Sequence, residues 1–341
     1  MVSINDVAAK ANVSISTVSR VMNQNANVSK EKEKAVLEAV EELDYIPNGL
    51  ARGLVTKNTN SVGILIADIA NMYYASLVKS IEKTLNQQGY YTIIGNTEWD
   101  KKREEHYLRY LMQKQVDGFI LASTVLDDKY IDKFSKKGIP MVVLDREIES
   151  DLIDKIRIND YNGAYQATTH LVESNYDFFL HIAGPKKAAT ALDRSKAFVD
   201  ALKENNISAE NYKILAGSFR EESGAQKIAD FLADFDYKGR RIGIFAANDA
   251  AAFGIMKELK ERQLSVPEQF GVIGFDDVNF SRYADPPLTT ISRPIKEIGE
   301  ITASILMERI ENSNEGKYLK KNITLKVDLI KRGSTAKLNF N

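Results

Sequence analysis

From Val62 onward the chain alternates short β-rich apolar runs with longer amphipathic segments, and this alternation strongly limits its fold. The runs at 62–68 and 139–145 are rich in valine, isoleucine and leucine, and the segments after such runs repeat their apolar residues every three or four positions. That pattern is typical of parallel strands joined by crossover helices. A second set of the same kind begins after residues 155–160. The sequence therefore predicts an α/β domain of two subdomains over residues 61–341.

The helices expected in this region share an apolar period close to 3.6 residues. They are residues 74–88, 101–115, 161–174, 190–205, 221–234 and 295–313. A terminal strand is expected to follow the last of them.

Polar and aromatic side chains gather at the carboxyl ends of several predicted strands and in the loops beside them. They are Asp145, Arg146, Arg194, Phe219, Arg220, Asn248, Asp249, Asp276 and Asp277. In open α/β sheets, ligands bind outside these strand ends. Carboxylate, amide and guanidinium groups suit the hydroxyls of a sugar, and an aromatic ring suits its apolar face. Any one of the Asn and Asp residues could instead be a helix cap, but their convergence on one cleft favours a small sugar ligand.

The first 46 residues follow a different pattern, that of three short helices. Ser3 and Asp6 resemble a capping box, and Ser14 can cap a second helix after a tight turn. A third helix is expected after Ser29. This arrangement predicts a helix-turn-helix DNA-binding domain over residues 1–46. A small helical bundle with a polar surface is the alternative that periodicity leaves open.

Composition excludes several other classes. The chain has 341 residues and no cysteine, which rules out disulfides, thiolate catalysis and cysteine metal sites. The formal net charge of -1 gives no global sign of nucleic-acid binding, so a DNA site has to be local. No signal peptide or apolar membrane segment is visible, and no catalytic or metal-binding motif is found. We expect a cytoplasmic protein that is not an enzyme, with no metal, cofactor or membrane partner.

The amino-terminal residues resemble a known family in detail. The pattern "IxDVAxxAxVSxxTVSRVxN", followed by "VS" and by "YIPNGLARGL", runs from Ile4 to Leu54 and is similar to the LacI/GalR family of bacterial transcription regulators. The resemblance implies base contacts from Ile15, Ser16 and Arg20 on the second helix. It implies phosphate contacts or capping roles for Ser14, Thr17, Ser19 and Asn23. It also implies a hinge helix and linker at 47–60, with Leu50 and Leu54 on one face and Leu54 wedged between base pairs in the minor groove.

The rest of the chain resembles periplasmic sugar-binding proteins, with a pocket pattern of the ribose type. The matching positions are Asn71, Tyr74, Asp145, Arg146, Arg194, Phe219, Asn248 and Asp276. Tyr73 and Thr190 match effector contacts of purine-responsive relatives, whereas Ala188 stands where those relatives carry arginine. Arg293 stands where ribose binders carry glutamine, which leaves room for another pentose, a hexose or a phosphorylated sugar.

Together these features predict a repressor of sugar-utilisation genes that leaves a palindromic operator when a ribose-like sugar binds. The partners implied are double-stranded operator DNA, a small sugar effector and a second copy of the chain. A dimer is expected rather than a tetramer, because no leucine-heptad tail is visible. The sequence leaves open a corepressor sugar, an activator, or a phosphocarrier protein as co-effector. An enzyme and a transport receptor are the alternatives from other classes.

Overall fold

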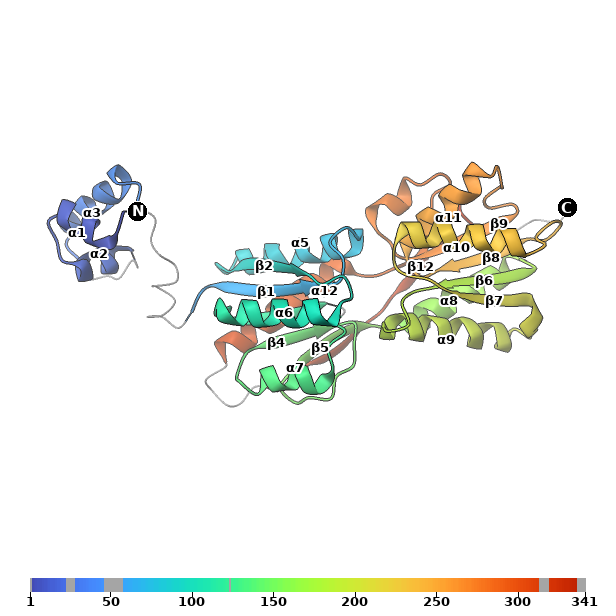
Figure 1. The fold of residues 1–341 in the computed structure, drawn as a ribbon, viewed down its shortest axis with the longest axis horizontal. Coiled ribbons are helices and arrows are strands. Elements are labelled where there is room, and N and C mark those ends of the chain that lie inside the picture. The colour runs from blue at the N-terminus through green and yellow to red at the C-terminus, as the bar shows by residue number, and fades with distance from the viewer. Residues whose placement is uncertain (1, 23–27, 46–57, 123, 313–318, 336–341) are drawn as a thin grey trace. The chain divides into compact units, whose positions relative to one another are not determined.

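The computed structural model describes residues 2–22, 28–45, 58–122, 124–312 and 319–335. The chain divides into two compact units, residues 1–59 and 60–341, and each is described by itself (Figure 1).

The described residues of the first unit form three helices, α1 (Ile4–Lys10), α2 (Ile15–Met22) and α3 (Lys30–Glu42). The predicted capping box is present, because the Ser3 backbone N–H and hydroxyl both donate to the Asp6 carboxylate at 2.8 Å. The tight turn before α2 places Asn12 in the left-handed region, at φ 51°. Val7, Val18, Val21 and Val36 form the buried centre of the unit together with small side chains. The expected helix-turn-helix is confirmed.

The second unit contains two six-stranded sheets. The first has the order β11-β5-β4-β3-β1-β2, with strands β1 (Ser61–Ile66), β2 (Tyr91–Asn96), β3 (Gly118–Ala122), β4 (Met141–Leu144), β5 (Asp154–Ile158) and β11 (Asn322–Leu325). The second has the order β12-β10-β9-β8-β6-β7, with strands β6 (Phe178–Ala183), β7 (Tyr212–Ala216), β8 (Ile242–Ala246), β9 (Phe270–Asp276), β10 (Thr289–Ser292) and β12 (Asp328–Ile330). Every pairing is parallel except that of β10 with β12.

Helices cover both faces of each sheet, as the alternating pattern predicts (Figure 1). The first sheet carries α5 (Met72–Asn86), α6 (Lys101–Gln113), α7 (Asp128–Ser135) and α12 (Ile295–Glu311). The second carries α8 (Asp160–Glu173), α9 (Ala189–Glu204), α10 (Glu221–Asp234) and α11 (Asp249–Glu261). Two short 3-10 helices, η1 (Ala209–Asn211) and η2 (Asn279–Arg282), lie in connecting loops. The predicted α/β fold with two subdomains is confirmed.

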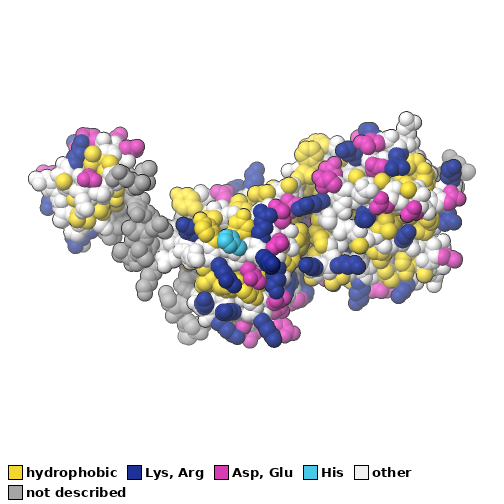
Figure 2. Space-filling model, viewed as in Figure 1, with side chains coloured by type: hydrophobic (Ala, Val, Ile, Leu, Met, Phe, Trp, Pro, Cys, Tyr) yellow, Lys and Arg dark blue, Asp and Glu magenta, His cyan; other side chains and the backbone are white. Residues whose placement is uncertain are grey.

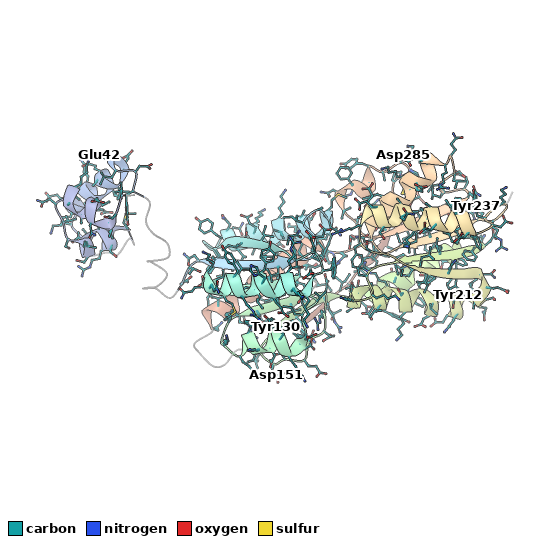
Figure 3. All side chains as sticks on the ribbon, in the orientation of Figure 1. Glu42, Tyr130, Asp151, Tyr212, Tyr237 and Asp285 are labelled. Carbon is teal, nitrogen blue, oxygen red and sulfur yellow. The ribbon has the colours of Figure 1, made fainter. Side chains whose placement is uncertain are left out.

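Three details differ from the expectation. Helices α7 and α11 were not predicted. Tyr130 of α7, labelled in Figure 3, accepts a hydrogen bond from Arg109 Nε of α6 at 3.1 Å. The end of the chain holds two short strands rather than one, and each joins a different sheet. Helix α12 follows the second sheet in sequence but packs against α5 of the first subdomain. The chain therefore passes between the subdomains three times, after β5, after β10 and after β11.

Within the residues that the structure describes, no helix is both long and apolar enough to cross a membrane.

Candidate ligand cleft and DNA-recognition helix

The carboxyl ends of the two sheets meet around one small cavity of about 20 Å³. Ten of the eleven predicted ligand residues line it. They are Asn71, Tyr73, Tyr74 and Asp145 from the first subdomain, and Thr190, Arg194, Phe219, Asn248, Asp276 and Arg293 from the second. A cavity of this size holds about one water molecule. Both subdomains contribute to the wall, so the size of this cavity depends on how the two sheets are placed.

The backbone conformation at Asp145 and Asp276 orients the two carboxylates of the cleft. Asp145 directly follows β4 and has φ 59°, while Asp276 ends β9 and has φ 124°. Both values lie in the left-handed region that L-residues with a side chain rarely adopt. Non-glycine residues held there are enriched at ligand sites, where the surrounding structure maintains the strain.

Arg293 joins the two subdomains at the centre of the cavity. Its Nη2 donates to Asp145 Oδ1 at 2.5 Å and to the Tyr73 hydroxyl at 2.6 Å, and the Tyr73 hydroxyl in turn donates to Asp145 Oδ2 at 3.1 Å. Its Nη1 lies 3.5 Å from Asp276 Oδ1, within ion-pair range. The guanidinium also stacks on the Tyr73 ring, 3.9 Å from its centroid. Burial raises the pKa of the Tyr73 phenol well above its usual value, so the phenol keeps the proton that it donates.

Arg194 forms a second buried cation in the same cavity. Its Nε and Nη2 donate to Asp160 Oδ1 at 2.9 and 2.7 Å, and its Nη1 donates to the Ala247 carbonyl at 2.6 Å. The guanidinium lies 3.5 Å from the centroid of the Phe275 ring. These contacts fix its orientation. Asp160 was not predicted as part of the site, although it is the second residue after β5 and begins α8, close enough to the strand end for the strand-end rule to find it.

The carboxylates beside these cations titrate abnormally. Burial raises the pKa of Asp276 to about 7, although the Arg293 and Arg194 guanidinium groups act in the opposite direction. Burial also raises the pKa of Asp160, against the opposing effect of Arg194. The cleft therefore holds one carboxyl group that changes its charge near neutral pH.

Asn248 shows that capping and cleft lining are compatible. Its Oδ1 caps α11 by accepting from the Ala251 N–H at 3.0 Å, and its Nδ2 donates to the Phe219 carbonyl at 3.1 Å. The side chain thus both starts a helix and holds the loop that carries Phe219. Its neighbour Asp249 is buried and accepts bonds from the Val278 N–H and the Ser281 and Thr290 hydroxyls. Asp249 therefore supports the structure beneath the cleft.

Arg146 is the predicted ligand residue that does not line the small cavity. Its guanidinium donates to the Leu126 carbonyl and to Asp128, away from Asp145. It lines an adjoining cavity of about 450 Å³, which shares Asp145 and Thr190 with the first. Arg146 and Asp145 therefore line the adjoining cavity together, whereas only Asp145 also lines the small one.

Trp99 is a further residue that the sequence did not single out. It lines the adjoining cavity, and its ring centroid lies 5.6 Å from that of Phe219 on the other subdomain. Arg220, next to Phe219, donates from Nε to Asp68 Oδ2 at 3.2 Å. These two contacts join the subdomains at the mouth of the cleft.

The recognition helix α2 presents a polar face. Ile15, Ser16 and Arg20 are exposed, while Val18 and Val21 on the other face are buried. The Ser14 hydroxyl accepts from the Thr17 N–H at 3.2 Å and lies 2.8 Å from the Ser16 hydroxyl. Thr17 and Ser19 are half-buried at the edge of this face. The other predicted DNA contacts, Asn23, Leu50 and Leu54, lie outside the described residues.

Comparison with known families agrees with this geometry. The family of bacterial regulatory proteins named lacI matches residues 3–48, and a periplasmic binding protein-like domain matches residues 168–335. The HTH-type transcriptional repressor PurR of Photobacterium profundum is 33% identical over 340 residues, which cover 99% of this chain and 100% of that protein. The chain belongs to the lacI family.

Other relatives show the same domain organisation. The ribose operon repressor of Halalkalibacterium halodurans is 36% identical over 91% of each chain. A LacI-family regulator of Enterococcus faecium, solved with bound ribose, is 31% identical, with a TM-score of 0.73 over 82% of this chain and all of that one. The lac repressor dimer bound to operator is 28% identical, with a TM-score of 0.83 over 98% of this chain and 99% of that one. The relatives named as repressors regulate transcription and are not enzymes, and the predicted regulator class of this chain is confirmed.

Proposed function

We propose that this lacI-family protein is a dimeric, cytoplasmic repressor of sugar-utilisation genes, released from its operator by a small sugar of the ribose type. The observation that carries the proposal is the buried set of polar groups around Asp145, Arg194, Asn248 and Asp276 at the facing sheet edges. Overall identity does not choose the effector, because repressors named PurR and the ribose operon repressor are about equally similar. The polar lining, with Phe219 beside it, favours a polyol ring.

The proposed release depends on movement between the two subdomains. A sugar is larger than the 20 Å³ cavity, so its binding is expected to change the spacing of the two sheets, with the three interdomain crossovers as the hinges. This change would alter the positions of the two recognition helices of the dimer relative to the half-sites of a two-fold operator. Coupling of this kind is reciprocal, so DNA should weaken sugar binding by the factor by which sugar weakens DNA binding.

Arg20 provides the test of the DNA-binding half of the proposal. Operator fragments would be selected from genomic DNA with the purified full-length protein and measured by fluorescence anisotropy. Arg20→Ala should lower operator affinity by about tenfold or more, since a bidentate arginine–guanine contact gives about 1–3 kcal/mol of discrimination. Lys10→Ala, on the face of α1 that pairs with Glu42 of α3, is the control. Equal losses in both variants would contradict a base-reading role for Arg20.

A ligand screen tests the other half. Ribose, xylose, glucose, their phosphates and a purine base would be compared by the rise in melting temperature, which reports binding to the native state. A sugar that raises the melting temperature should also release the selected operator. If a sugar binds but strengthens operator binding, the protein is a corepressor-dependent regulator. If no sugar binds and a phosphocarrier protein changes operator affinity, the signal is a protein.

A further inference from the structure

One buried donor in the cleft lacks a partner. Arg293 Nε is fully buried and makes no hydrogen bond within the described residues. Arg293 Nη1 reaches Asp276 only at 3.5 Å, beyond the usual length of an N–H···O bond. The Nη2 group is the only part of this guanidinium with short bonds, to Asp145 and Tyr73. An unsatisfied buried donor is costly. Because Arg293 lines the cavity, a ligand bound there could supply the acceptor oxygen that its Nε lacks.

The charge around that donor is already compensated. The buried ionisable groups around the cavity are two cations, Arg194 and Arg293, and three carboxyl groups, Asp145, Asp160 and Asp276. The side chains of all five are no more than 5% exposed. The cluster therefore has a free hydrogen-bond donor and no free positive charge. A further anion buried here would add to an excess of carboxyl groups, without a cation to balance its desolvation.

We propose that Arg293 is the specificity-determining residue of the cleft: it donates through Nε to a hydroxyl oxygen of an uncharged sugar, and the cleft rejects sugars that carry a phosphate or carboxylate. This inference rests on the proposed function and narrows its effector class. Position 293 carries arginine where ribose binders carry glutamine, and on this proposal the arginine binds an uncharged hydroxyl group of the sugar. The carboxyl groups around Arg293 already balance its charge, so the arginine does not serve to bind a phosphate group.

Cationic side chains in the adjoining cavity offer a second place where a phosphate could bind. Lys101 and Lys187 line it with Arg146. A sugar phosphate could place its ring beside Arg293 and its phosphate against these side chains. Lys101 is paired with Asp127, and Arg146 with Asp128, so the charges of these two are compensated. Lys187 is exposed, so water and salt screen its charge. We therefore expect no gain in affinity from a phosphate, and a direct comparison of matched ligands decides the point.

The first experiment is calorimetric titration of the full-length protein with matched ligands. The neutral sugar that binds best among ribose, xylose and glucose is compared with its terminal phosphate and with its sugar acid. We expect the charged forms to bind at least about tenfold more weakly, because a second anion would lose its hydration beside the buried carboxyl groups with no free cation to balance it. Equal or tighter binding of the phosphate overturns the assignment while leaving a sugar-responsive repressor in place. Absence of binding by every sugar overturns the proposed function as well.

The second experiment uses Arg293→Lys and, as a matched control, Arg262→Lys at the exposed end of α11. Lysine keeps the positive charge between Asp145 and Asp276 but has no Nε–H donor at the same place. Arg293→Lys should bind the neutral sugar about tenfold more weakly, whereas Arg262→Lys should stay within about twofold of the parent. Unchanged sugar affinity in a folded Arg293→Lys protein contradicts the proposal. If Arg293→Lys does not fold, the comparison of neutral and charged ligands on the parent protein still decides it.

Discussion

At the scale of single residues, Asp276 makes stability depend on pH in a direction opposite to that of most acids. Its pKa is raised by burial from 3.8 to about 7. Between these values the folded protein holds a proton that the unfolded chain releases. The free energy of unfolding therefore falls as pH rises through this window and levels off above it.

Asp276→Asn removes this titration and keeps a hydrogen-bonding side chain. The melting temperature of the variant relative to the parent should rise as pH increases from about 4 to 7 and then stay constant. Asp160 and Asp249, whose pKa values burial also raises, and His181, whose pKa burial lowers to about 4, are present in both proteins and largely cancel in the difference. A difference that does not vary with pH would mean that Asp276 does not take up its proton in the folded state.

The residues of the cleft were largely predictable because strand ends are visible in the sequence. Asp145, Asn248 and Asp276 follow apolar runs directly, and parallel strands bring such ends together. The sequence could not show that Arg146 lines the adjoining cavity rather than the small one, because its place depends on its bonds to Leu126 and Asp128. Trp99 could not be predicted, since its position depends on Phe219 of the other subdomain.

At the scale of elements, α10 and α11 cross closely where two glycines face backbone. A Cβ on Gly224 would overlap the Ala251 carbonyl, and one on Gly254 would overlap the Glu221 carbonyl. Backbone cannot move aside as a flexible side chain can, so Gly254→Ala should lower the free energy of unfolding by about 1–3 kcal/mol. Urea denaturation of Gly254→Ala beside Glu261→Ala, an exposed position on the same helix, measures this. Equal midpoints in both variants would show that the helices separate without cost.

Periodicity predicted most of the long helices, but it did not find the 13-residue α11 and it failed for short elements. The segment 221–234 was predicted with the observed bounds, whereas α5 begins two residues before the predicted 74 because Asn71 caps it. The eight residues of α7 are too few for a clear period. Strands β11 and β12 are four and three residues long and belong to different sheets, a tertiary property that no local pattern contains.

At the scale of the whole molecule, exposed aromatic residues mark a surface of the second unit for the partner copy. Tyr91 on the edge strand β2 is 69% exposed, and Phe280 and Tyr283 in and after η2 are 64% and 81% exposed. Hydrophobic side chains lie at the surface in both regions in Figure 2, and Figure 3 places Asp285, close to η2 in sequence, at the outer edge of the second subdomain. Exposed apolar groups of this size are typical of protein interfaces.

We therefore predict that these aromatic residues hold the dimer together, with a consequence for DNA binding. Phe280→Ser with Tyr283→Ser should shift the sedimentation mass from two chains toward one, since buried aromatic side chains dominate the energy of such interfaces. Leu319→Ser is the control: this residue is 84% exposed and lies before β11, at the opposite edge of the first sheet from β2. Because a two-fold operator is read by two copies at once, the monomeric variant should bind a single half-site and lose most of its affinity for the palindrome. A double-serine variant that remains dimeric would place the interface on another face.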